Sequence, residues 1–123
     1  MVLQSTGLQH RDLIAMSEIC RTTEGLIQRS FDAGVSSVIN IGAGISLPVR
    51  EMARFIQHRC QAVLNFCPGL TWSESVGKEE PDPLEYRSNG LGELNLMPRI
   101  DNTAEVDELL AFCAATFGKR PGA

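Results

Sequence analysis

This chain of 123 residues has no long apolar run, no basic leader and no concentration of positive charge. No apolar stretch approaches the roughly 20 residues that a membrane-spanning helix needs, so we expect no membrane partner. Residues 1–10 have neither the basic start nor the apolar centre of a secretory signal, and we expect a cytoplasmic protein. The net charge is −4 and the arginines are scattered, which argues against nucleic acid as a partner.

The four cysteines also lack the spacing of a metal site. None of Cys20, Cys60, Cys67 and Cys113 forms a Cys-x-x-Cys pair, and no histidine stands at ligand spacing from them. We therefore expect neither a structural metal nor a disulfide. Cys20 and Cys113 fall among apolar helix positions, which predicts that both are small buried hydrophobic residues.

Fingerprints of cofactor binding and of catalysis are missing too. Gly42 and Gly44 follow an apolar run and precede a helical pattern, but the third glycine of a dinucleotide-binding fingerprint would fall at Leu47. Tyr86 is the only tyrosine, and Gly90 stands where a Tyr-x-x-x-Lys dyad needs its lysine. We interpret residues 42–44 as a tight strand-to-helix turn, and we expect this chain alone to bind no cofactor.

What is present is ordinary globular composition, with 43% hydrophobic and 21% charged residues, enough for one α/β domain. Apolar periodicity predicts three main helices and a few short strands. The first helix is expected to begin at Ser17 and to close at residues 32–34, and Ser46 and Pro48 mark the start of the second. Asp101 or Thr103 caps the last helix, and strands are expected over 37–41 and 64–66. Residues 71–85 are rich in serine, glutamate and proline and predict a long polar loop, which is usually functional or mobile.

The helical periodicity also predicts which faces are buried. In the first helix the inward positions are Ile19, Cys20, Thr23, Leu26, Ile27 and Ser30, and the outward ones are Glu18, Arg21, Glu24 and Gln28. In the second helix the buried stripe is Val49, Met52, Ala53, Ile56, Cys60 and Val63. The apolar positions of the third helix are Val106, Leu109, Leu110, Phe112, Cys113 and Phe117.

Four short motifs occur in an order that resembles a known enzyme family. They are RDLIAM (residues 11–16), INIGAG (39–44), PVREMA (48–53) and LNLMP (94–98). Together they resemble the C-terminal part of the extended short-chain dehydrogenase/reductases, the NAD-dependent nucleotide-sugar epimerases and dehydratases. The resemblance covers about residues 7 to 117. It implies an α/β fold that is the substrate-binding part of such an enzyme, without the N-terminal Rossmann core.

The resemblance also implies which residues bind substrate. In family members the arginine of the Arg-Asp segment commonly reaches the diphosphate of the nucleotide sugar, so Arg11 is the first candidate. A guanidinium suits this task because its fork matches two phosphate oxygens. The family offers a second arginine and an aspartate in the later loop, and here Lys78 and Asp82 occupy that neighbourhood.

The cofactor fingerprint and the Tyr-x-x-x-Lys dyad of this family belong upstream of Arg11. We therefore expect no catalysis and no NAD or NADP binding by this chain alone. As a single domain of residues 1–123, it would place residues 1–45 against the missing Rossmann sheet. Residues 46–123 would form the substrate-binding lobe with its loop at 71–85. Two alternatives stay open: a stand-alone nucleotide-sugar-binding module, and an interaction domain that pairs with itself or with a Rossmann partner.

Overall fold

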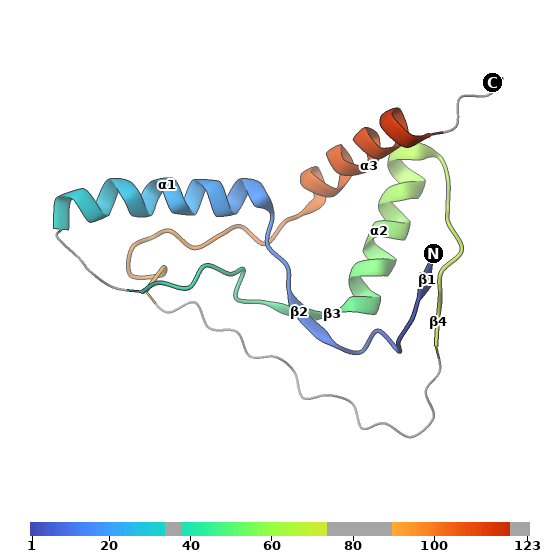
Figure 1. Cartoon of the computed structure of the whole chain (residues 1–123), viewed down its shortest axis with the longest axis horizontal. Helices are drawn as coiled ribbons and strands as arrows, with labels where there is room; N and C mark the ends of the chain where they lie inside the picture. Colours follow the sequence, from blue (N-terminus) through green and yellow to red (C-terminus); the bar gives the residue numbers. More distant parts are fainter. Residues whose placement is uncertain (34–37, 74–89, 119–123) are drawn as a thin grey trace. The chain divides into compact units, whose positions relative to one another are not determined.

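The computed structural model describes residues 1–33, 38–73 and 90–118 (Figure 1). Within these ranges the chain is a small mixed α/β protein with three helices and four short strands, which confirms the predicted class at this level. The helices are α1 (Met16–Ala33), α2 (Val49–Leu64) and α3 (Thr103–Phe117). The strands are β1 (Val2–Leu3), β2 (His10–Asp12), β3 (Ser46–Pro48) and β4 (Thr71–Trp72).

The chain divides into two compact units, each built from separate stretches of sequence. The first unit comprises Met1–Leu8, Pro48–Glu80 and Thr103–Ala123, and the second comprises Gln9–Leu47 and Pro81–Asn102. No helix among the residues that the structure describes combines the length and the apolar character needed to cross a bilayer.

In the first unit, β1 and β4 form a two-stranded parallel sheet in which Val2 lies opposite Thr71 and Leu3 opposite Trp72. The N-terminal ammonium group donates to the carbonyl of Gly69 at 2.5 Å, and this contact extends the pairing. Two-stranded sheets this short are marginal by themselves, so neighbouring contacts must support them. One such contact is the Arg54 guanidinium, which lies 5.2 Å from the ring centroid of Trp72.

Helix α2 follows the predicted pattern closely. Pro48 directly precedes it, as expected of a residue whose fixed φ suits a helix start. Ala53 and Cys60 are buried, seven residues apart on one face, and the rest of the predicted stripe is half-buried. The helix ends at Leu64, because Asn65 takes the left-handed conformation with φ of 54°, and the next N–H, that of Phe66, bonds to the carbonyl of Cys60 at 3.5 Å.

Helix α3 lies against α2 in the same unit. The two helices are joined by a bidentate ion pair, in which Arg59 donates to the two oxygens of Asp107 at 2.7 and 2.6 Å. None of the α3 residues is buried, and large apolar side chains on it stay more than half exposed: Leu109, Phe112 and Phe117. The prediction that Cys113 is buried is wrong.

In the second unit, β2 pairs with β3, and α1 lies beside a tight turn at residues 90–95. Leu91 and Leu96 of this segment are buried, and the Thr22 hydroxyl of α1 donates to the carbonyl of Leu96 at 3.3 Å. Gly25 allows this approach, because a Cβ there would stand 2.5 Å from Leu96 Cδ2. The core of this unit is therefore built on small residues of α1.

The buried face of α1 differs from the predicted one. Glu18 and Thr22 are buried, whereas Cys20, Thr23 and Ile27 are exposed. The sequence pattern followed apolar periodicity, but the structure buries the polar residues that bond to the 96–99 segment: Thr22 bonds to Leu96 and Glu18 to Arg99. Glu18 tolerates burial because its Oε2 accepts three hydrogen bonds, two from the Arg21 side chain and one from the Arg99 backbone N–H.

Both predicted strands are wrong. Residues 38–41 form no strand, and Val38 is 98% exposed. β-branched residues favour extended backbone, but a strand also needs ladder pairing, and the two sheets of the described residues are β1 with β4 and β2 with β3. Residues 64–66 are the end of α2 and its cap rather than a strand.

Candidate functional site

Arg11 lies in the middle of β2, in the second unit, and its side chain is exposed. The guanidinium donates to the carbonyl of the neighbouring His10 at 2.9 Å. Among the described residues no carboxylate forms an ion pair with it. Arg11 is therefore a cation that is held near its own strand and is open to an anion from solution.

Asp12, the next residue, fastens β2 to the glycine turn. Its Oδ1 accepts the N–H of Ala43 and its Oδ2 accepts the N–H of Gly44, both at 2.8 Å. Ala43 is buried, and Gly44 has a φ of 73°, a conformation that suits glycine. Two of the motifs that are far apart in the sequence, RDLIAM and INIGAG, thus meet in one pair of charge-assisted hydrogen bonds.

This contact also bears on the turn itself. Consecutive backbone N–H groups are the donors with which glycine turns bind phosphate. Here the N–H groups of Ala43 and Gly44 already bind a carboxylate of the same chain. The geometry agrees with the interpretation of residues 42–44 as a structural turn rather than a phosphate cradle.

A second polar cluster joins the start of α1 to residues 97–99. Glu18 Oε2 accepts from Arg21 at 3.0 and 2.8 Å and from the backbone N–H of Arg99 at 2.8 Å. Arg21 also donates to the carbonyl of Met97 at 2.8 Å. The Arg21 hydrogen bonds, followed by the Arg99 N–H, lower the pKa of Glu18 below its ordinary value. Helical periodicity did not predict this cluster, because it places Glu18 on the outer face of α1.

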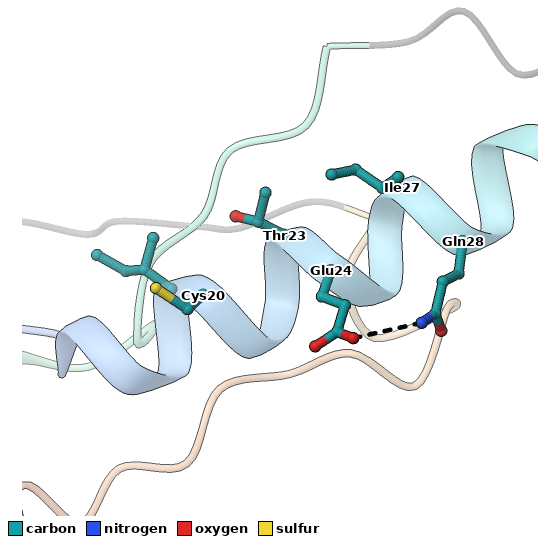
Figure 2. Close-up of a pocket in the computed structure, with 6 residues that line it drawn as sticks. Cys20, Thr23, Glu24, Ile27 and Gln28 are labelled. Atoms are coloured by element: carbon teal, nitrogen blue, oxygen red, sulfur yellow. Dashed lines mark hydrogen bonds between the residues drawn. The ribbon is translucent and has the colours of Figure 1, made fainter.

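Helix α1 also carries a surface hollow of about 490 Å³ (Figure 2). Its described lining comes from this one helix and consists of Ile19, Cys20, Thr23, Glu24, Ile27 and Gln28. The Gln28 amide donates to Glu24 at 3.5 Å along the rim, as Figure 2 shows. These are largely the positions that periodicity predicted to be buried, so the hollow is the unfilled side of an apolar stripe.

Of the three predicted substrate ligands, the structure places only Arg11. Lys78 and Asp82 lie outside the described residues, so their roles stay predictions. In the described ranges no group of three His, Cys, Asp or Glu side chains gathers as metal ligands do. The four cysteines are free, and Cys60 is the buried one.

Comparisons with protein-family models, with curated proteins and with solved structures found no match to this chain.

Proposed function

We propose that this chain is the C-terminal substrate-binding part of an NAD-dependent nucleotide-sugar epimerase or dehydratase of the extended short-chain dehydrogenase type. In this proposal the chain binds the diphosphate of a nucleotide sugar in the cytoplasm. Catalysis and NAD or NADP binding belong to a Rossmann partner. The proposal is supported by the order of the four sequence motifs and by one structural observation, the exposed Arg11 guanidinium without a carboxylate partner among the described residues.

Arg11 is suited to a diphosphate for three reasons. The guanidinium is always charged and offers a planar fork of donors to two phosphate oxygens. It stands on a strand, whose backbone is held by pairing with β3 and by the Asp12 contacts. The positive charge of Arg11 is also available to a ligand, because the neighbouring Asp12 carboxylate binds the N–H groups of the glycine turn instead.

A binding titration with Arg11 variants tests the proposal. UDP-glucose and GDP-mannose are titrated into the full chain by calorimetry. Arg11→Ala should weaken binding by about tenfold or more, since a charge-assisted hydrogen bond contributes roughly 1.5–3 kcal/mol. Arg29→Ala is the matched control, because Arg29 is an exposed arginine of α1 in the same unit. If Arg11→Ala and Arg29→Ala lose the same amount of affinity, the loss reflects the change in net charge. That result would contradict a specific site at Arg11.

A second candidate is an interaction domain that pairs with itself or with a Rossmann domain. It is favoured by α3, which presents Leu109, Phe112 and Phe117 to solvent at 59%, 59% and 74% exposure. The last nine residues of this helix carry no charge. The same titration separates the candidates, since an interaction domain binds neither nucleotide sugar and is indifferent to Arg11→Ala.

A further inference from the structure

Both carboxylate oxygens of Asp12, in the second unit, accept hydrogen bonds from backbone that is distant in the sequence. Each oxygen accepts a single N–H at 2.8 Å, from Ala43 and Gly44, which lie 31 and 32 residues further along the chain. A carboxylate that receives two short N–H bonds fixes both the distance and the orientation of the two segments. The contact therefore acts as a clamp between β2 and the glycine turn.

The clamp has two consequences for the neighbouring Arg11. Successive side chains of a strand point to opposite faces, so a fixed Asp12 also fixes the direction in which Arg11 leaves β2. In addition, the negative charge of Asp12 is engaged by backbone N–H groups and does not form an ion pair with Arg11. The same contact thus orients the cation and leaves it unneutralised.

We propose that Asp12 is a positioning residue: by clamping β2 to the Gly42–Gly44 turn, it presents Arg11 to the diphosphate of a nucleotide ligand without touching that ligand. This inference rests on the proposed function for the role of Arg11. The clamp carries much of the positioning, because β2 has three residues and belongs to a two-stranded sheet, which has little rigidity of its own.

The first test needs no ligand. Asp12→Asn keeps one acceptor oxygen and replaces the other with an amide group that faces a backbone N–H. Nitrogen-15 relaxation of the free full chain should then show a more mobile Arg11 Nε–Hε group, together with changed amide shifts for Ala43 and Gly44. An Arg11 side chain with unchanged mobility, despite the loss of the clamp, would overturn the inference.

The second test measures affinity for UDP. Asp12→Asn should weaken binding by about tenfold, as loss of a supporting residue typically does. In an Arg11→Ala background it should cause no further loss. Unchanged or tighter binding by Asp12→Asn would contradict positioning, since it would mean that the freed turn amides bind the anion themselves. Glu93→Gln is the control, because it makes the same charge change at an exposed turn residue.

One further variant and the wild-type chain distinguish failure of this inference from failure of the proposed function. Asp12→Glu retains the carboxylate on a longer side chain and should recover part of the ordering of Arg11. It replaces Asp12→Asn where the latter fails to give a dispersed spectrum. Absence of UDP binding by the wild-type chain would defeat the proposed function, whereas the mobility of Arg11 would still decide whether Asp12 orders it.

Discussion

Gly7 holds a backbone conformation that few other residues can adopt. Its φ is 69°, and its carbonyl accepts the N–H of Arg50 at the start of α2, at 2.9 Å. A Cβ at this position would stand 2.9 Å from Arg50 Cβ and 3.1 Å from the Arg50 nitrogen. Both the backbone angle and the lack of space therefore require glycine here.

Replacing Gly7 with alanine should destabilise the protein. The left-handed conformation alone costs a residue with a Cβ about 1–2 kcal/mol, and the contact with backbone adds to this. Urea denaturation of Gly7→Ala should show a loss of at least this size. Gly92→Ala is the control, since no atom lies within 4 Å of its added Cβ and its φ is not positive. A Gly7→Ala protein as stable as Gly92→Ala would contradict the account of this turn.

Glu18 gives the second unit a dependence on pH. Because Arg21 and the Arg99 N–H lower its folded pKa, the ionised carboxylate stabilises the folded state. That contribution is complete above the unfolded pKa, near 4.5, and is lost as the pH falls through the lower folded value. The stability difference between wild type and Glu18→Gln should therefore be largest at neutral pH and should shrink below about pH 4.5.

Thermal unfolding of both proteins over a pH series measures this difference. Glu24→Gln serves as the control, because Glu24 is exposed on the same helix and, within the described ranges, accepts a long hydrogen bond from Gln28, at 3.5 Å. A difference between wild type and Glu18→Gln that stays constant down to pH 2–3 would show that ionisation of Glu18 does not stabilise the fold.

Among the elements, α2 and α3 are joined by the Arg59–Asp107 pair, whose two side chains are 28% and 29% exposed. Both oxygens of Asp107 receive a hydrogen bond, which is the stronger form of an arginine–carboxylate contact. Partial exposure keeps the contribution modest.

A double-mutant cycle on Arg59→Ala and Asp107→Ala should give a coupling free energy of about 1 kcal/mol in favour of folding. Added salt should reduce this coupling, since part of the pair is in contact with solvent. Chemical denaturation of the four proteins measures it. A coupling of zero at low salt would mean that the apolar contact of the two helices holds them together without help from the pair.

The helices were predictable because their signals are local. Pro48, the acidic first turns and the spacing of Ala53 and Cys60 all lie within the segment that they specify. Strands depend on partners that are distant in sequence. The β-branched residues at 38–41 therefore predicted a strand that the structure does not form. The buried face of α1 was missed for the same reason, since Leu96, 74 residues from Thr22, decides which face is covered.

At the scale of the whole molecule, the sequence predicted the α/β class but not the division into two interleaved units. Of the candidate site, the motif singles out Arg11, whose role in binding stays a prediction. The contact of Asp12 with Ala43 and Gly44 was not predictable, because every residue except proline has a backbone N–H and the donors therefore cannot be recognised from residue type. The assignment to the nucleotide-sugar enzymes rests on motif order and on the geometry around Arg11, and it is a proposal about the whole chain.

A proton–nitrogen NMR titration of the full chain with UDP-glucose and GDP-mannose tests this proposal most directly. The account predicts dispersed peaks that shift on ligand addition, with the largest changes at residues 10–12, and with these shifts lost in Arg11→Ala. A folded chain whose spectrum is indifferent to both ligands, or whose shifts cluster on the α1 hollow of Figure 2 instead, would contradict it.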